Sequence, residues 1–525
     1  MSAETIAPRP AKPTAAASSA DRLKSATFEV VEAAVQELVA SHDADAAELL
    51  GQLYSRGDAP RRLLAIRALG KLAQPGLEPA LFRVATADLF QAIRNAATDS
   101  LGVIESKDKA TDRFVKATHD TEHLQPLERY RALVAVGRLG GKGAAACLRE
   151  WLKSSETDMA VAAADGLAKL GDLNQVEFLL GEINMKDKEV GPAIRESLEQ
   201  LSQQKFGFDM LKWNAWLKER RETASATAAA SSPGETKPAE KTPEPFSTPP
   251  AKEDDARGEE IGEIGLARPK IEDYVAYAPY VPAIETTPID LVIVYDTTGS
   301  MAHVWVDLMR KAFGNALEHL LKNTPSLRVG TIKFRASDPN KTLTYMISPK
   351  PLTRDYEAVL KDMRYTGFGG GSGGLDLGIK YAIHSMPWRP NARKIILVVG
   401  DCSPDNDLNV CMRMIAEAWM MDGIIVDTLY AQTLHGPEHR KVFFDLAAAG
   451  VGHAFEYSGK WQFMADMSAD TPDITKAESV AELARKLVTP RDRTRAEIEA
   501  QKPAVDEKPR DPPKVKEKED EAPPP

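Results

Sequence analysis

Apolar residues recur at two different spacings along the chain, and the spacing changes near residue 286. From residue 25 to residue 221 they return at intervals of about three to four residues, which is typical of amphipathic helices. From 286 to 488, short and nearly continuous apolar runs alternate with amphipathic stretches. That pattern is typical of buried strands separated by helices. The sequence therefore predicts two folded blocks of different class.

The helical block contains an internal repeat. Its similar segments lie at 65–72, 96–104, 131–139, 163–170 and 193–201. The equivalent apolar positions are Leu69, Leu101, Val136, Leu167 and Leu198, at steps of 31 to 35 residues. This period suits helix pairs stacked into a solenoid, because one pair alone cannot bury its apolar face. The alternative is an ordinary helical bundle, since leucines and small residues recur in any helical core.

The repeated segments resemble HEAT-like repeats, and "RLLAIRALGKL" at 62–72 is the nearest match. The resemblance covers about 180 residues and implies an α-solenoid with an extended binding surface. The stretch 206–221 is expected to form a terminal helix. Trp213 and Trp216 are three positions apart, so both can face the last repeat.

The second block is predicted to be a doubly wound, mostly parallel α/β sheet with helices on both faces. Its expected strands lie at 291–295, 328–334, 342–347, 394–399, 423–430 and 453–457. Helices are expected at 304–323 and 439–450. Because the strands are near-continuously apolar, we expect them to be covered on both sides.

The segments 1–24, about 222–260 and 489–525 are rich in Pro, Ala, Glu and Lys and poor in large apolar residues, and the linker is taken to run from 222 to 285. Such segments cannot offset the entropy of ordering, so we expect a disordered N-terminus, an extended linker and a disordered charged tail. The linker would raise the effective concentration of each block for a partner assembly that both recognise.

The charge and cysteine content narrow the range of partners. Formal net charge is −10, with 67 Lys+Arg against 77 Asp+Glu, so no overall basic field attracts nucleic acid or anionic lipid. Three scattered cysteines, Cys147, Cys402 and Cys411, do not make a disulfide framework. The N-terminus lacks the apolar core of a signal peptide, and apolar runs fall short of the ~20 residues of a membrane span. We expect a cytoplasmic protein without membrane insertion.

Candidate metal ligands follow two of the predicted strands. The stretch "IDLVIVYDTTGSM" at 289–301 runs from an apolar strand into Asp296, Thr298 and Ser300, and Asp401 follows the strand "KIILVVG". Ligands of open parallel sheets bind at the carboxyl ends of strands. Carboxylate and hydroxyl oxygens suit Mg²⁺, which prefers hard oxygen donors in octahedral geometry.

The string "DTTGSM" resembles the opening of the metal-ion-dependent adhesion site of von Willebrand factor type A domains, whose pattern is Asp-x-Ser/Thr-x-Ser. Asp296, Thr298 and Ser300 match that pattern, and Asp401 matches the final aspartate. The family flanks that aspartate with threonine before and glycine after. Gly400 and Cys402 occupy these positions here, and we interpret Cys402 as a packing residue because a thiol suits Mg²⁺ poorly.

The resemblance also implies a hydroxyl ligand from a middle loop and an antiparallel edge strand. The glycine-rich stretch 365–379 supplies Ser372 as first choice and Thr366 as the alternative. The edge strand is expected at 342–347. A bound Mg²⁺ or Mn²⁺ would then bind an Asp or Glu of a protein partner. The whole chain would be a non-enzymatic interaction scaffold whose helical repeats offer a second binding surface.

An enzymatic alternative uses the same residues. "DTTGSMA" also resembles the aspartyl-phosphate loop of haloacid-dehalogenase-like phosphatases, with Asp296 as nucleophile and Asp401 and Asp405 holding Mg²⁺. Those phosphatases place a second aspartate two residues after the nucleophile. Thr298 is found there instead and cannot act as a general acid near neutral pH. His435 and His439 lack a cysteine pair to complete a zinc site and are expected to be polar loop residues.

Overall fold

The computed structural model describes the two predicted blocks. The residues described are 19–25, 27–41, 45–183, 187–230, 288–308, 317–320, 324, 326–335, 347–364, 366–369, 373–404, 408–431, 437–457 and 461–464. The predicted tail at 489–525 and most of the predicted linker lie outside these ranges. Among the described helices, none combines the length and hydropathy that crossing a membrane demands.

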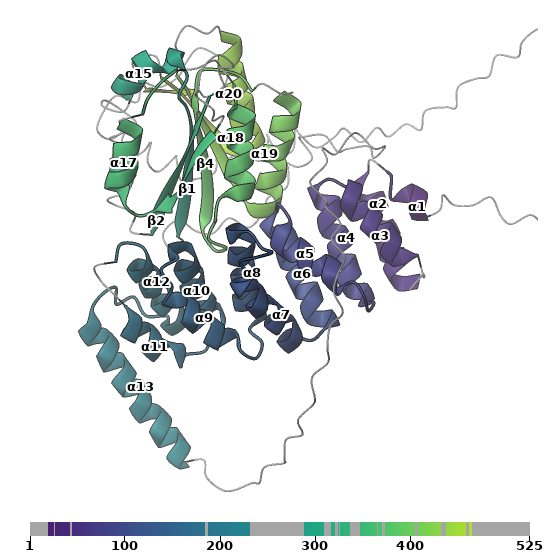
Figure 1. Ribbon diagram of the computed structural model, residues 1–525, viewed down its shortest axis with the longest axis vertical. Coiled ribbons are helices and arrows are strands. Elements are labelled where there is room, and N and C mark those ends of the chain that lie inside the picture. Colours follow the sequence, from purple (N-terminus) through teal and green to yellow (C-terminus); the bar gives the residue numbers. More distant parts are fainter. Residues whose placement is uncertain are drawn as a thin grey trace, which may run out of the picture. The chain divides into compact units, whose positions relative to one another are not determined.

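The N-terminal block is helical, and its helices pack as consecutive antiparallel pairs (Figure 1). The pairs are α3 (Ala46–Arg56) with α4 (Ala59–Leu72), α5 (Glu78–Ala87) with α6 (Gln91–Ile104), α7 (Lys107–His119) with α8 (Pro126–Leu139), α9 (Ala144–Leu152) with α10 (Thr157–Lys169), and α11 (Gln175–Glu182) with α12 (Val190–Ser202). Before them come α1 (Ser19–Arg22) and α2 (Phe28–Ser41), and after them comes α13 (Met210–Ala230).

The repeat period found in the sequence corresponds to these pairs. Each of the five equivalent apolar positions lies on the second helix of its pair, and all five are buried. The second helices α4, α6, α8, α10 and α12 also pack against one another in order. One row of the stack is therefore formed by these even-numbered helices. Trp213 is fully buried, and Trp216 packs beside it with ring centroids 6.2 Å apart.

Local signals in the sequence set the helix boundaries. The side chain of Asp58 accepts a hydrogen bond from the Arg61 N–H at the start of α4. At α8, Glu128 accepts from the Gln125 N–H, and the helix ends at Gly140 with φ of 65°. These are the capping arrangements that satisfy otherwise unpaired backbone groups.

The C-terminal block is a seven-stranded sheet in the order β3-β2-β1-β4-β5-β6-β7, as counted over the described residues. Its strands are β1 (Ile289–Asp296), β2 (Leu327–Phe334), β3 (Ile347–Thr353), β4 (Arg393–Gly400), β5 (Ile425–Ala431), β6 (Val451–Tyr457) and β7 (Trp461–Met464). The five from β2 to β6 in sheet order are parallel, and β3 and β7 pair antiparallel at the edges. The mostly parallel α/β fold expected from the sequence is confirmed.

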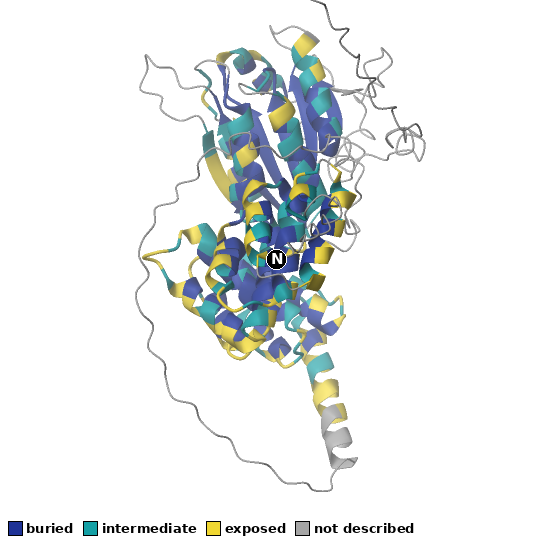
Figure 2. Cartoon of the chain, turned by 90° about the vertical axis from the view of Figure 1, so that its right-hand side faces the viewer, coloured by how far each residue is buried: buried dark blue, intermediate teal, exposed yellow. Residues whose placement is uncertain are grey.

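Helices cover both faces of this sheet (Figure 1). One face carries α15 (Ala302–Asp307) and α17 (Tyr356–Arg364), and the other carries α18 (Leu375–Ser385), α19 (Leu408–Asp422) and α20 (Pro437–Ala449). A short 3-10 turn, η2 (Gly299–Met301), precedes α15. Figure 2 shows the central strands buried along their whole length, as near-continuously apolar parallel strands require.

The structure differs from the sequence-based expectation most clearly at three boundaries. The antiparallel edge strand is β3 at Ile347–Thr353, whereas 342–346 of the expected strand lie outside the described residues. Pro349 and Pro351 weakened the strand signal of β3, although an edge strand tolerates proline. In addition, α1 begins before residue 24, and α13 continues past 221 to Ala230 because the stretch "TASATAAA" is rich in good helix formers.

Close packing of α8 on α10 generates a stability prediction. A Cβ added at Gly137 would lie 2.7 Å from the Cα of Gly166, a backbone atom that cannot move aside alone. We expect Gly137→Ala to destabilise the helical block by about 1–3 kcal/mol through overpacking. The matched control is Gly181→Ala in α11, where an added Cβ meets nothing within 4 Å. Thermal unfolding of both variants provides the measurement, and an equal or higher midpoint for Gly137→Ala would contradict this packing.

Candidate metal centre

Parallel pairing of β1 with β4 brings two aspartates together. Tyr295 pairs with Val399 in this ladder, so Asp296 and Asp401 both emerge at the carboxyl edge of the sheet. Both aspartates are fully buried. One ligand atom from each of Asp296, Asp401 and Cys402 lies within 4.8 Å of the others. Among the described residues, this is the one cluster of three such side chains that meets metal-ligand spacing.

The turn after β1 positions the hydroxyl side chains. The N–H and Oγ1 of Thr297 both donate to the carbonyl oxygen of Phe334 at the end of β2, at 3.0 and 3.1 Å. The N–H of Thr298 donates to Asp296 Oδ1 at 2.7 Å. The hydroxyl oxygens of Thr298 and Ser300 are 3.0 Å apart. The structure therefore gathers Asp296, Thr298 and Ser300 into one turn, next to Asp401.

Gly400 and Cys402, which depart from the type A pattern, both contact Asp296. A Cβ added at Gly400 would lie 3.1 Å from the Asp296 Cβ, so glycine provides the space that the aspartate side chain occupies. The Cys402 thiol donates to Asp296 Oδ2 at 3.2 Å. Both oxygens of Asp296 are thus oriented by hydrogen bonds, one from the Thr298 backbone and one from the thiol. Cys402 is buried, as a packing residue would be, but it also positions Asp296.

The glycine-rich loop reaches the same edge of the sheet. The N–H of Gly369 donates to the Thr297 carbonyl oxygen at 3.0 Å, and Arg335 donates to the Gly369 carbonyl oxygen at 3.4 Å. The backbone of Gly373 forms a hydrogen bond with the Cys402 sulfur. Ser372, the first choice for the middle-loop ligand, lies outside the described residues between these two anchors.

Thr366, the alternative ligand, has its hydroxyl engaged elsewhere. It donates to the Asp362 carbonyl oxygen at 2.8 Å and lies 3.0 Å from the hydroxyl of Tyr295. Tyr295 packs against Trp305 of α15, with ring centroids 4.8 Å apart, on the α15 and α17 face of the sheet. Side chains alternate along a strand, so the next residue, Asp296, points to the opposite face. The hydroxyl of Thr366 therefore lies beside Tyr295, on the face of the sheet opposite to the Asp296 side chain.

A histidine supports the loop that follows Asp401. His439 Nδ1 lies 3.1 Å from the Ser403 N–H and 2.8 Å from its hydroxyl oxygen. The prediction that His439 is a polar loop residue is wrong: Pro437 begins α20 at its first position, where a proline ring is tolerated, and His439 lies within that helix. His435 and Asp405 lie outside the described residues. This pairing was missed because nothing in a sequence indicates that 403 and 439 meet.

Burial controls the electrostatics of the site. It raises the pKa of Asp296 to about 7, and the Asp401 carboxylate adds to this, while the Thr298 N–H opposes it. Burial and the Asp296 charge together raise the pKa of the Cys402 thiol, so the thiol keeps its proton. A divalent cation next to Asp296 would lower the pKa of this carboxyl group, because the positive charge stabilises the ionised form. The two carboxylates and two hydroxyls fit the hard-oxygen preference of Mg²⁺ or Mn²⁺.

The raised pKa of Asp296 generates a pH prediction for the chain in EDTA. Between the usual aspartate value of 3.8 and about 7, the folded chain holds a proton that the unfolded chain has released. Stability therefore decreases as pH rises through this window. We expect Asp296→Asn, which removes the titration, to raise the thermal midpoint at about pH 8 and to change it little at about pH 4. Thermal scans across this range test it, and a difference independent of pH would contradict the assignment.

Comparisons with known proteins do not assign the chain to a family. No family model matches it, and no curated protein does. Among solved structures, the pilus adhesin SpaC of Lactobacillus rhamnosus GG, in its open conformation, matches at 14% identity and a TM-score of 0.29. That match covers 38% of this chain and spans only 30% of the adhesin. Human deoxyhypusine hydroxylase in complex with glycerol matches at 18% identity and a TM-score of 0.16, over 35% of this chain and 72% of the hydroxylase. Likenesses this low carry no argument about function.

Proposed function

We propose that the α/β block is a metal-dependent protein-binding domain of the von Willebrand type A kind. The observation that carries this proposal is the meeting of Asp296 and Asp401 in one buried cluster at the carboxyl edge of the sheet, beside the hydroxyls of Thr298 and Ser300. In an open parallel sheet this edge is the usual place for a ligand.

The donor set supports Mg²⁺ or Mn²⁺ as the ion. Asp296, Thr298, Ser300 and Asp401 supply oxygen atoms, and Ser372 would add a further hydroxyl from the glycine-rich loop. Mg²⁺ keeps several exchangeable waters when a protein offers few carboxylates. Neutral hydroxyl ligands also leave more of the ion's positive charge uncompensated. An Asp or Glu carboxylate of a protein partner would replace one of these waters, and no covalent bond would be broken.

One feature of the turn favours binding over phosphoryl transfer. A phosphatase that uses an aspartate nucleophile needs a general acid to protonate the leaving group. The second position after Asp296 is Thr298, whose hydroxyl cannot act as that acid near neutral pH. We therefore propose a binding role, without a catalytic step.

The helical stack supplies a candidate for the second binding surface. A groove of about 460 Å³ opens between α3, α4 and α5. Its wall is mostly apolar and includes Ile66 and Leu69, and its polar part is a linked set in which Tyr54 and Arg62 both donate to Asp88. Such a mixture of apolar wall and fixed polar groups is typical of ligand pockets.

Direct metal binding is the first test. We expect calorimetry on the intact chain to detect Mn²⁺ binding that Thr298→Ala weakens by about tenfold or more, since loss even of an outer-shell partner typically costs that much. The matched control is Thr366→Ala, which removes a hydroxyl held by Asp362 and Tyr295. Absence of Mn²⁺ and Mg²⁺ binding by the unmutated chain would overturn the proposal.

The same measurement identifies the middle-loop ligand. We expect Ser372→Ala to weaken Mn²⁺ binding and Thr366→Ala to change it by no more than about twofold. The hydroxyl of Thr366 is hydrogen-bonded on the face of β1 opposite to the Asp296 side chain. Capture of a partner from a lysate in Mn²⁺ and in EDTA then follows with the same variants. Loss of binding in Thr366→Ala with full binding in Ser372→Ala would assign the role to Thr366 instead.

A further inference from the structure

The amino edge of the sheet, at the opposite strand ends from the metal centre, contacts the even-numbered helices of the stack. The contacts come from the segment 384–391, which runs from the last turn of α18 toward β4, from Asp422 at the end of α19, and from Arg354 after β3. On the stack they reach α6, α8, α10 and α12. Both sets belong to one compact unit of the chain.

Asp422 caps a helix that has no local cap. The residue before α6 is Phe90, whose side chain has no oxygen to accept from the first N–H groups. The two oxygens of Asp422 accept instead from the N–H groups of Gln91 and Ala92, at 2.8 and 2.9 Å. A carboxylate is also favoured by the helix dipole at this end. Helix α6 is thus completed by a residue from the other block.

A second group of contacts is ionic. Glu196 of α12 accepts from Arg354 at 2.9 Å and from Arg389 at 3.2 Å. Arg389 also bonds the fully buried Asp290 of β1 through its backbone N–H and its Nε. Burying a charge is costly unless it is paired and hydrogen-bonded, and here the arginines and carboxylates pair across the boundary.

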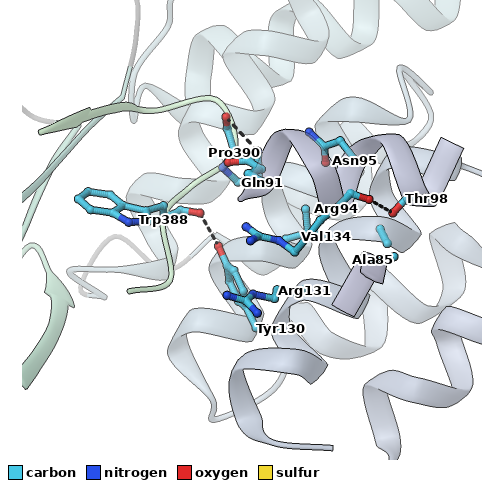
Figure 3. Close-up of a pocket in the computed structure, with 11 residues that line it drawn as sticks. Ala85, Gln91, Arg94, Asn95, Thr98, Tyr130, Arg131, Val134, Trp388 and Pro390 are labelled. Atoms are coloured by element: carbon cyan, nitrogen blue, oxygen red, sulfur yellow. Dashed lines mark hydrogen bonds between the residues drawn. The ribbon is translucent and has the colours of Figure 1, made fainter. Parts of the chain in front are cut away.

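Between these two groups lies an apolar and main-chain contact (Figure 3). The Tyr130 hydroxyl donates to the Trp388 carbonyl oxygen at 3.1 Å, and Arg131 donates to the His384 carbonyl oxygen at 2.7 Å. Phe90 and His384 pack edge to face with ring centroids 5.4 Å apart. The cavity that Tyr130 and Trp388 line is only about 20 Å³, which is room for about one water. The two surfaces therefore meet closely.

We propose that the amino edge of the sheet is a docking surface specific for the chain's own helical stack, and that the two blocks form one rigid unit set by the Asp422 cap and the Glu196–arginine pairs. The partner is identified by its chemistry: the even-numbered helices of the stack, with an uncapped amino end at α6 and the acidic Glu196 within α12. The helix surface used in this way is then closed to other proteins. This proposal does not depend on metal binding.

The test uses the full chain with a specific protease site introduced between residues 240 and 250 and cleaved after folding. We expect the two fragments to remain associated through size-exclusion chromatography at about 1 µM. Asp422→Ala and Glu196→Ala should each weaken the association about tenfold or more, as loss of a charged hydrogen-bond partner does. The matched control is Glu357→Ala, an exposed acidic residue in the first turn of α17. Fragments that separate at once, or an Asp422→Ala variant that behaves like Glu357→Ala, would overturn the proposal.

Amide hydrogen exchange on the uncleaved chain gives a second measurement in case a variant folds poorly. We expect Asp422→Ala to speed exchange at Gln91 and Ala92, the two N–H groups that the carboxylate accepts, and to leave the middle of α6 unchanged. Asp422→Asn keeps one acceptor oxygen and should restore part of the protection. Unchanged exchange at both amides in Asp422→Ala would overturn the capping role.

Discussion

Parallel pairing of β1 with β4 is the constraint on which the rest of the site depends. The strands are adjacent in the sheet although their paired residues are 104 positions apart in the chain, and the pairing of Tyr295 with Val399 sets Asp296 level with Gly400. Because Gly400 lacks a side chain, the Asp296 carboxylate can lie across the end of β4, where Cys402 donates to it. A shift of one residue in this register would turn Asp296 toward α15 and α17, among apolar side chains.

Much of this architecture was predictable because apolar patterns are strongest where burial is most complete. The central strands are covered on both faces, so their runs of Val, Ile and Leu stand out in the sequence. The stack was predictable for a related reason: each second helix is buried by both neighbours, and its repeat position is therefore apolar. By contrast, β3 is partly exposed and contains two prolines, and its position was misjudged.

For the candidate site, the sequence predicted which residue types follow β1 and β4 but not their contacts. The hydrogen bond from Cys402 to Asp296 depends on which way a side chain turns, and the engagement of Thr366 depends on the face to which Tyr295 points. The Asp422 cap joins groups 331 residues apart in the chain, and its local sequence resembles any helix end. Such long-range pairings have no periodicity, so a single sequence does not reveal them.

The two ends of β1 make different contacts, and this affects how the domain responds to force. Asp296 lies at one end beside the candidate metal, and Asp290 lies near the other end, bonded to Arg328 and Arg389 at the face that meets the stack. A ligand pulled away from the carboxyl edge would load the strand along its own axis. In a ladder loaded in that direction, the hydrogen bonds to β2 and β4 are sheared together and not opened one after another. We therefore expect the domain to resist force most strongly along the axis of β1, from the carboxyl edge of the sheet to its amino edge.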